Sequence, residues 1–450
     1  MKRRLVVVGG VAAGMSAAAR AKRLNPALDV VVLEKGEYIS YGACSLPYFV
    51  AGYFDDYRKL LARTPEEARE QGIDVRTGHN VTGIDLKAGT VTVQAHGKEE
   101  TVPFDTLLLA TGAVPVVPGG WQVNGIEGIH LLRTVEDAQR LRAQVGRGVG
   151  RAVIVGGGYI GVEMADALRE RGISVSIMDM ADQLLTNFDA DMARHVEEDL
   201  RSDGVEVHLG DGVAEIESRD GRVSGVRTQA GRRMAADLVL LALGVRPNVE
   251  LAREAGIPLG ETGAIAVDRR QRTGTEGVFA AGDCCETRHL VTGRSTYIPL
   301  GTTANKQGRV AGTVIAGKEA EFPGVVGTAV LKARRIAAAR TGLSEQQAKS
   351  LGYDAVAEII KAKDRVATYP GAQDLWVKLV AERGSGRLLG AQVAGCGAGA
   401  VAKRIDVVAT ALFHGMTVEE FSYLDLSYAP PFSTVWDPLL VAANVLQRHL

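Results

Sequence analysis

The sequence predicts an α/β protein with two parallel-sheet domains and a third, α+β domain at its carboxyl end. Two observations predict the first two domains: a short apolar run followed by a glycine-rich turn at residues 5–14, and the same pattern at residues 151–161. The third domain is predicted because such turns stop at about residue 325 while strands and helices continue. A chain of 450 residues is long enough for several cores.

The first unit has the order strand, glycine turn, helix, strand. Residues 5–8 form a continuous apolar run, as a buried parallel strand requires, and residues 9–14 form the turn. A helix is predicted over residues 16–23 and a second strand over residues 29–33, ending at Glu34. The turn departs from the GxGxxG pattern of dinucleotide sites because Val11 occupies the position of the middle glycine.

The second unit keeps the full GxGxxG pattern, with a strand at residues 151–155 and a helix through residue 170. Gly158 lets the backbone approach a pyrophosphate, whose charge would lie at the helix N-terminus. Asp179 ends the next strand, where an acid can bind ribose hydroxyls, and no Arg or Lys follows in residues 180–183. This arrangement favours NADH over NADPH; the alternative is a tight glycine turn without a ligand.

Later segments complete each unit. Residues 104–109, followed by Ala110, Thr111 and Gly112, and residues 238–243, followed by Gly244, are predicted strands. Residues 277–283 form an apolar strand that ends in Gly-Asp, and a helix is predicted to start within residues 301–308. With the first turn, this is the combination that flavoprotein reductases with two dinucleotide sites use for FAD. Asp283 would bind the ribityl or pyrophosphate region, unless it only caps a turn.

The last 125 or so residues mix strands at 329–333, 375–381 and 388–393 with helices, one of them capped by Ser344 and Gln347. Composition is that of a globular protein, and 52 basic against 53 acidic residues leave a net charge of −1. The balance argues against partners such as nucleic acid or anionic membranes. Four cysteines do not form a secreted disulfide framework, and no apolar run spans a bilayer. We therefore expect a soluble, cytoplasmic protein.

Cys44 is the most informative residue of the chain because it has no cysteine at any nearby spacing. A thiol beside a flavin that lacks an internal partner must find that partner in a substrate or an oxidant. A helix over residues 46–50 would begin just after Cys44, and a helix N-terminus lowers a thiol pKa. The alternative is a buried small hydrophobic residue, which is how we interpret Cys284 and Cys285.

On these residues the chain resembles the pyridine nucleotide-disulfide oxidoreductases over essentially its full length. Within them it is most similar to the coenzyme A-disulfide reductases and the related persulfide reductases, which have a single redox cysteine. The motifs that carry the resemblance are SxxxCxxPY at residues 40–48, GGGYIGVE at 156–163, TYPG at 368–371, KRID at 403–406 and YAPPF at 428–432.

The resemblance implies a glutathione reductase-like fold and a homodimer. Its expected domains are an FAD-binding domain (residues 1–115 and 248–325), an NAD(H)-binding domain (116–247) and a dimerisation domain (326–450). It also implies three cofactors or ligands: FAD, NADH and coenzyme A, with coenzyme A present as a mixed disulfide or as substrate. No metal site, nucleic acid or membrane is expected, and the partners are a second copy of the chain and a small-molecule disulfide.

The resemblance implies four groups of site residues. The catalytic residues are Cys44, which forms a mixed disulfide with coenzyme A, and Tyr369 and Tyr428, which reach the active site of the partner subunit. Tyr159 gates the nicotinamide pocket and Glu163 lies beside it. The FAD residues are Gly9, Val11, Ala12, Gly14, Glu34, Lys35, Thr111, Gly112, Asp283 and Ala304. The NADH residues are Gly156, Gly158, Tyr159, Ile160, Gly161, Glu163, Asp179 and Gly244. The coenzyme A residues are Arg20, Arg23, Ser40, Ala43 and Trp436.

Three positions depart from the family pattern. Ala43 stands where the family often has Asn, and Trp436 stands where some members have Lys. Ala12 stands where flavin peroxidases and some oxidases have His, so a general acid for peroxide cleavage is missing. Arg20 and Arg23 fit coenzyme A phosphates or, equally well, the solvated face of an amphipathic helix.

The sequence therefore predicts a reductase that passes hydride from NADH through FAD and Cys44 to coenzyme A disulfide or coenzyme A persulfide. Two alternatives within the same chemistry are an NADH oxidase or peroxidase with a Cys44 sulfenic acid, and an NADH-dependent persulfide or polysulfide reductase. An alternative from another class is an electron-transfer flavoprotein that reduces a ferredoxin-like partner, in which Cys44 and both tyrosine motifs would have no purpose.

Overall fold

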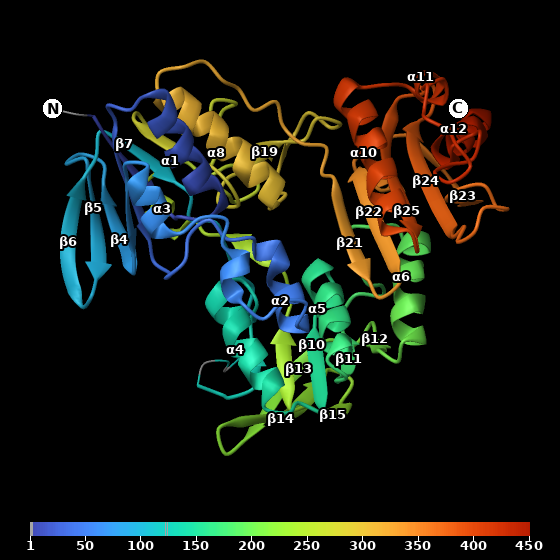
Figure 1. Ribbon diagram of the computed structural model, residues 1–450, viewed down its shortest axis with the longest axis horizontal. Coiled ribbons are helices and arrows are strands. Elements are labelled where there is room, and N and C mark those ends of the chain that lie inside the picture. The colour runs from blue at the N-terminus through green and yellow to red at the C-terminus, as the bar shows by residue number, and fades with distance from the viewer. Residues whose placement is uncertain (1–2, 122, 124) are drawn as a thin grey trace.

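The computed structural model describes residues 3–121, 123 and 125–450, so residues 1, 2, 122 and 124 of the predicted domain ranges lie outside the described part. It has three lobes, each built on its own five-stranded sheet (Figure 1). The chain leaves the first lobe after about residue 110, builds the second, and returns to the first before it forms the third. The predicted fold class is confirmed, while the exact domain boundaries remain a proposal.

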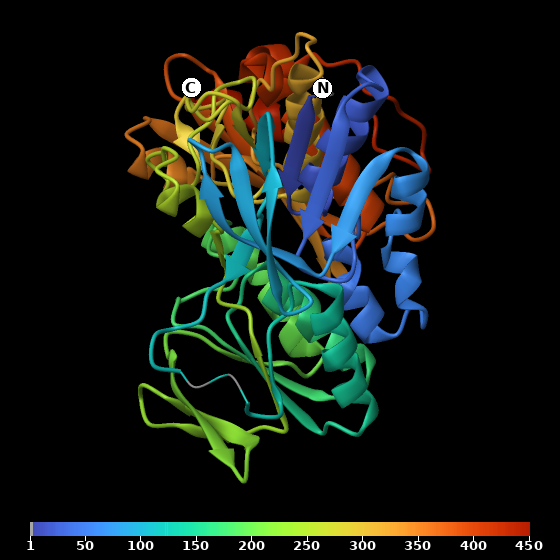
Figure 2. The ribbon, with the colours of Figure 1, turned by 90° about the vertical axis from the view of Figure 1, so that its left-hand side faces the viewer.

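The first lobe has a parallel sheet of strand order β18-β7-β1-β2-β3. Its bounds are β1 Arg4–Val8, β2 Asp29–Glu34, β3 Ile73–Thr77, β7 Thr106–Leu109 and β18 Val278–Ala280. Helices α1 (Ala12–Leu24), α3 (Pro65–Glu70) and α8 (Gly301–Ile315) pack with this sheet. A separate antiparallel sheet of β4 (His79–Asp85), β5 (Thr90–Ala95) and β6 (Lys98–Pro103) lies in front of it in Figure 2.

The second lobe repeats this design with the parallel order β12-β11-β10-β16-β9. Its strands are β9 Ile129–His130, β10 Arg151–Val155, β11 Ser174–Met178, β12 Glu206–His208 and β16 Leu238–Leu241. Its helices are α4 Val135–Gly146, α5 Tyr159–Glu170 and α6 Ala190–Ser202, and a meander of β13 (Val213–Arg219), β14 (Arg222–Thr228) and β15 (Arg233–Ala235) follows. Strands β8 (Ala113–Pro115) and β17 (Val245–Pro247) pair where the chain crosses between the two lobes.

The third lobe has an antiparallel sheet of order β21-β22-β25-β24-β23. Its strands are β21 Ala329–Ala333, β22 Ile336–Gly342, β23 Ala355–Lys363, β24 Asp374–Glu382 and β25 Leu388–Gly395. Its helices are α9 Glu345–Ser350, α10 Ala398–His414, α11 Val418–Ser422 and α12 Pro438–Leu446. Ser344 and Gln347 form the predicted capping box at the start of α9.

Several predicted element boundaries are wrong. Strand β18 covers only Val278–Ala280 of the predicted residues 277–283. Helix α1 begins at Ala12 rather than Ser16, because the glycine turn is tighter than the spacing suggested and ends after Val11. Strand β7 begins at Thr106, since Phe104 and Asp105 still belong to the connection from β6. Strand β16 ends at Leu241, where it pairs with Val155, the last residue of β10.

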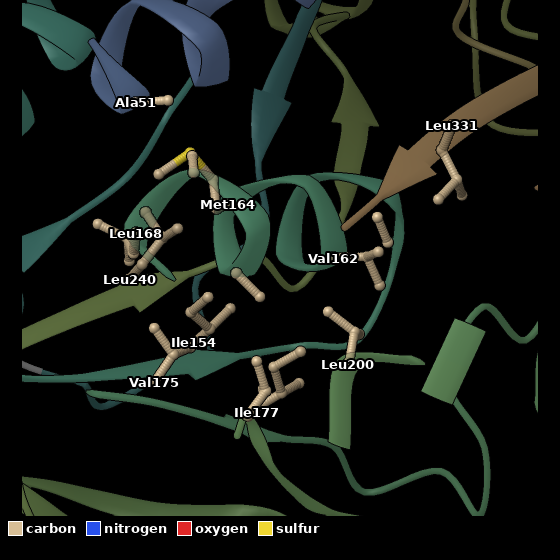
Figure 3. Packing of buried hydrophobic residues seen from close by; sticks show 14 of the residues in the cluster. Ala51, Ile154, Val162, Met164, Leu168, Val175, Ile177, Leu200, Leu240 and Leu331 are labelled. Carbon is tan, nitrogen blue, oxygen red and sulfur yellow. The ribbon is translucent and has the colours of Figure 1, made fainter. Parts of the chain in front are cut away.

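The hydrophobic core of the second lobe extends into its neighbours. Figure 3 shows Leu168 of α5 on the side of the helix that faces Ile154 and Val175 of strands β10 and β11, and Met164 on the opposite side, toward Ala51. Ala51, from the short helix α2 (Leu46–Ala51), and Leu331 of β21 belong to the same buried cluster. The helix that follows Cys44 is therefore anchored in the core of the second lobe.

Helices α1 and α8 pack at very close range because glycine faces the partner helix. A Cβ at Gly308 would lie 2.2 Å from the carbonyl oxygen of Ala13, and one at Gly312 would lie 2.3 Å from that of Ala17. Both distances are far inside van der Waals contact, so any larger residue must push the helices apart.

We expect Gly312→Ala to lower the free energy of unfolding by about 1–3 kcal/mol, the usual cost of overpacking a core. The matched control is Gly399→Ala in α10, where a Cβ meets no atom within 4 Å. That substitution should be neutral or stabilising by up to about 1 kcal/mol, because alanine favours helix. Urea denaturation followed by circular dichroism checks both; equal effects would contradict the packing argument.

Within the described residues, no helix is both long and apolar enough to cross a membrane.

Candidate active site

One large cavity of about 2220 Å³ lies where the carboxyl ends of the first two parallel sheets face each other. It is lined by the glycine turns of both units, by the segment around Cys44 and by parts of α8 and α10. A pocket for one drug-sized ligand is about 300–1,000 Å³, so this cavity has room for two dinucleotides. Ligands of open α/β sheets bind at this edge of the strands.

The two glycine turns hold an acid in the same way. The carboxylate of Glu34, at the end of β2, accepts a hydrogen bond of 2.7 Å from the backbone N–H of Gly10. The carboxylate of Asp179 accepts one of 2.6 Å from the backbone N–H of Gly157. Each carboxylate is thus fixed beside its own turn, where the ribose of a dinucleotide would lie.

The glycines of each turn have different tasks. A Cβ at Gly158 would meet no atom within 4 Å and would project into space that a pyrophosphate needs. Gly14 and Gly161 do not line the cavity. A Cβ at these positions would lie 1.8 Å from the carbonyl oxygen of Gly9 and 2.0 Å from that of Gly156, so they allow the helix to pack against the turn. Both turns fit a bound dinucleotide.

The structure places most predicted cofactor residues on the cavity wall. From the FAD group these are Gly9, Val11, Ala12, Glu34, Lys35, Thr111, Gly112, Asp283 and Ala304. From the NADH group they are Gly156, Gly158, Tyr159, Ile160, Glu163, Asp179 and Gly244. Because both groups line one continuous cavity, the geometry brings the two predicted nucleotide sites together.

Arg133 is a cavity residue that sequence reasoning missed. Its guanidinium donates to the Asp283 carboxylate at 3.0 Å and to the carbonyl oxygen of Ala113 at 3.3 Å. Burial raises the pKa of Asp283 even though Arg133 opposes this shift. A cation beside the FAD-binding motif suits a pyrophosphate, and its only sequence signal is its place one residue before the Thr134 capping box.

Cys44 lies in a 3₁₀ turn, Ala43–Ser45, directly before helix α2. Its thiol is exposed because it opens onto the cavity, and Ala43 lines the cavity beside it. Cys284 and Cys285 are buried as predicted, while Cys396 is exposed in the loop after β25. The structure therefore places one free thiol on the wall of the cavity that both glycine turns line.

The expectation that the helix lowers the thiol pKa is wrong. Desolvation by the cavity wall raises the pKa of Cys44, and the carboxylates of Glu163 and Asp283 raise it further, while Arg133 opposes them. Helix α2 has only six residues, so its dipole is small. Burial raises the pKa of Glu163 itself to about 7, with Asp166 adding to the shift.

These shifts predict the effect of Glu163→Gln. Above pH 7 the Glu163 carboxyl is ionised and repels the Cys44 thiolate, so its removal should lower the Cys44 pKa. The rate of iodoacetamide alkylation against pH, measured on the reduced protein in a Cys396→Ser background, gives that pKa. An unchanged or raised Cys44 pKa would contradict the electrostatic coupling.

Arg142 of α4 is a second residue that sequence reasoning missed. Its guanidinium donates to the carbonyl oxygens of Phe49 at 3.1 Å and Phe54 at 2.5 Å, and it lies over the Phe49 ring at 4.4 Å. These carbonyls lie at and after the end of α2. A charged side chain of the second lobe thus fixes the helix that follows Cys44, and the local sequence carries no signal of it.

The predicted coenzyme A residues are not gathered in the cavity. Apart from Ala43, none of them lines it. Arg20 donates to the Thr313 hydroxyl of α8 at 3.0 Å, and Arg23 is exposed at the end of α1. Ser40 adopts a left-handed backbone with φ 48°, and Trp436 is 58% exposed on the third lobe. Within one chain, these residues do not form a single site.

Tyr369 and Tyr428 also lie away from the cavity, on loops of the third lobe where they are 40% and 47% exposed. A hydrogen bond of 3.3 Å from the backbone N–H of Val366 to the carbonyl oxygen of Pro430 joins their loops. Buried Arg404 of α10 braces both loops, since it donates to the Asp364 carbonyl oxygen and forms an ion pair of 2.9 Å with Asp437.

Two family patterns of known proteins match this chain. The pattern of the family described as pyridine nucleotide-disulphide oxidoreductase matches residues 3–308, and the pattern of its dimerisation domain matches residues 328–438. The chain therefore belongs to the pyridine nucleotide-disulphide oxidoreductase family and carries that family's dimerisation domain.

Individual relatives cover nearly the whole chain. A protein of Pyrococcus horikoshii named NAD(P)H coenzyme A polysulfide/persulfide reductase is 42% identical over 99% of each chain. A Methanocaldococcus jannaschii protein named NADH oxidase is 35% identical over 99% of each chain. The solved structure of an NAD-dependent persulfide reductase from A. fulgidus superposes with a TM-score of 0.96, at 40% identity over 99% of this chain and 83% of that one.

Membership of this family defines the class of enzyme. The protein is an NAD(P)H-dependent flavoprotein oxidoreductase, with FAD and a pyridine nucleotide as its cofactors. Both cofactors agree with the prediction from sequence, and the cavity has the size and the glycine turns that they require.

Proposed function

We propose that the protein reduces sulfur–sulfur bonds that carry coenzyme A, either coenzyme A persulfide or coenzyme A disulfide, with NADH as the electron donor. The observation that carries the proposal is the position of Cys44, an exposed thiol on the wall of the cavity that both nucleotide turns line. The other exposed cysteine, Cys396, does not line that cavity, so Cys44 has no second thiol beside it there.

The two turns would hold the two cofactors. Glu34, Thr111, Asp283 and Arg133 would bind FAD, and Gly158 and Asp179 would bind NADH. When bound, FAD supplies a route for two electrons from the nicotinamide to a sulfur atom on Cys44. The fixed carboxylate of Asp179 supports NADH over NADPH, because it would repel a 2′-phosphate.

The Cys44 thiolate would attack the substrate sulfur that is bound to coenzyme A. One S–S bond breaks and another forms, which gives a Cys44–S–S–CoA mixed disulfide and releases a thiolate or hydrosulfide. Two electrons then break the mixed disulfide into the Cys44 thiolate and the coenzyme A thiolate. Each released thiolate takes up one proton.

Dimerisation would complete this site. We infer that Tyr369 or Tyr428 reaches the Cys44 region of a second copy and supplies the proton to the leaving thiolate. Their exposure in one chain supports this, as does the exposed apolar surface of Phe432, Val435 and Trp436 on the same loop. Trp436 could then stack on the adenine of coenzyme A.

Consumption of NADH under anaerobic conditions tests the proposed substrate. Coenzyme A persulfide or coenzyme A disulfide should support turnover at least about tenfold faster than glutathione disulfide, which has the same S–S bond without the coenzyme A moiety. Equal rates with both disulfides would contradict coenzyme A recognition. Turnover only when oxygen is admitted would favour the NADH oxidase, the activity named for the relative at 35% identity.

A further inference from the structure

Tyr159, the first residue of α5, lines the same cavity as the nucleotide turn and the redox thiol. It lines the cavity next to Gly158 and Ile160 on one side and Glu163 on the other. Burial raises the pKa of both Tyr159 and Cys44, and the Glu163 carboxylate raises each of them further, so Glu163 lies within electrostatic reach of both side chains. On the proposed function, Tyr159 lies on the wall of the cavity that the nicotinamide would enter.

The Tyr159 hydroxyl has a specific partner in the segment that leads into α6. The amide nitrogen of Asn187 donates to the Tyr159 oxygen at 3.0 Å, and Phe188 packs at a ring-centroid distance of 6.4 Å from the same tyrosine. Asn187 also lines the cavity. The tyrosine is thus held by residues of the segment that leads into α6.

The segment that carries Asn187 is rigid. The backbone N–H of Leu185 donates to the Gly157 carbonyl oxygen at 2.9 Å, and Leu185 adopts a left-handed backbone with φ 51°. The Gln183 side-chain amide donates to the Phe188 carbonyl oxygen at 2.9 Å. A leucine in this conformation persists only where its surroundings fix it.

The third lobe anchors the same segment at Asp189. Gln392 of β25 accepts from the Asp189 backbone N–H at 2.8 Å and donates to its carboxylate at 2.5 Å. The N-terminal N–H groups of α9 donate to this carboxylate at 3.0 and 3.1 Å, and Lys378 lies 3.3 Å away. Burial raises the Asp189 pKa, but these hydrogen bonds and Lys378 outweigh it and hold the pKa below its usual range.

We infer that Asn187 is a positioning residue that holds Tyr159 across the nicotinamide path, and that the third lobe fixes Asn187 in place through Asp189. The inference rests on the proposed function, because it needs the nicotinamide to bind at this turn. Two properties of the enzyme then depend on one hydrogen bond: entry of NADH, and access of oxygen to the reduced flavin. When Tyr159 is held closed, the apparent affinity for NADH is reduced by the fraction of open molecules.

Asn187→Leu tests the inference on the FAD-bound enzyme. It should lower the apparent KM for NADH roughly two- to tenfold, the range that one net hydrogen bond corresponds to. It should also accelerate reoxidation of the reduced flavin by oxygen by a similar factor in stopped-flow measurements. Asn187→Asp is the matched control, because its carboxylate can accept a hydrogen bond from the Tyr159 hydroxyl and should keep both values close to wild type.

A second variant tests the contact between Gln392 of the third lobe and Asp189. Gln392→Leu removes both contacts with Asp189 and should shift the same two quantities in the same direction; no shift in a folded Gln392→Leu protein would overturn the role of the third lobe. Unchanged values, or a raised KM, in Asn187→Leu would overturn the whole inference. If NADH fails to reduce the flavin of the wild-type enzyme, the proposed function itself fails and the inference falls with it.

Discussion

Cys44→Ser should lower NADH-dependent turnover with coenzyme A persulfide or disulfide by at least about a thousandfold, because a serine hydroxyl cannot form the mixed disulfide. The variant should still bind FAD, since Cys44 lies outside both glycine turns. A single equivalent of NADH should bleach the flavin absorbance of the variant, because it has no mixed disulfide to take up the two electrons. Steady-state rates and anaerobic stopped-flow spectra separate the lost step from the retained one.

Cys396→Ser is the matched control for this experiment. Cys396 is the other exposed thiol of the chain but does not line the cavity. Its replacement should leave turnover within about twofold of wild type, as surface substitutions usually do. Appreciable turnover in Cys44→Ser, or a comparable loss in Cys396→Ser, would remove Cys44 from the mechanism.

Arg404→Met should lower the free energy of unfolding by about 3–5 kcal/mol, because it leaves the buried Asp437 carboxylate without its partner. Arg404 is 7% exposed, and its guanidinium nitrogens lie 2.9–3.2 Å from the Asp437 carboxylate. Since Arg404 also holds the Asp364 carbonyl oxygen at 2.9 Å, both tyrosine-bearing loops should loosen. Because these loops carry Tyr369 and Tyr428, Arg404→Met should lower turnover as well as stability.

Lys403→Met gives the comparison for stability. The Lys403 side chain is 83% exposed and pairs with Asp406 at 3.1 Å on the surface, so its removal should change unfolding by less than about 1 kcal/mol. Urea midpoints at one fixed protein concentration measure both variants, because dimerisation makes stability depend on concentration. A loss below about 1 kcal/mol for Arg404→Met would contradict the role assigned to the buried pair.

The sequence predicts those parts of the structure that depend on local patterns. Strands β10 and β11 and the end of α5 lie where the apolar runs and glycine turn place them. The capping box of Ser344 and Gln347 forms as its spacing predicts. Each of these features depends on a few neighbouring residues, so the signal and the structure are both local.

The rest depends on contacts between distant parts of the chain. Arg133 reaches Asp283, and Arg142 reaches the carbonyls that follow Cys44, across many residues of sequence. The Cys44 pKa shows the same limit: the local helix suggests a lowered value, whereas desolvation and the distant Glu163 carboxylate raise it. The residues adjacent in the sequence therefore reveal neither the partner of a buried charge nor the environment of a thiol.

On the proposed mechanism, Cys44 carries coenzyme A as a mixed disulfide. The most direct test of this mechanism is to incubate the protein with coenzyme A disulfide, remove the excess, and add NADH without oxygen while the released thiol is identified by mass. We expect about one coenzyme A per subunit to be released from wild type and from Cys396→Ser, and none from Cys44→Ser. Release of no coenzyme A, or equal release from Cys44→Ser, would contradict the mechanism.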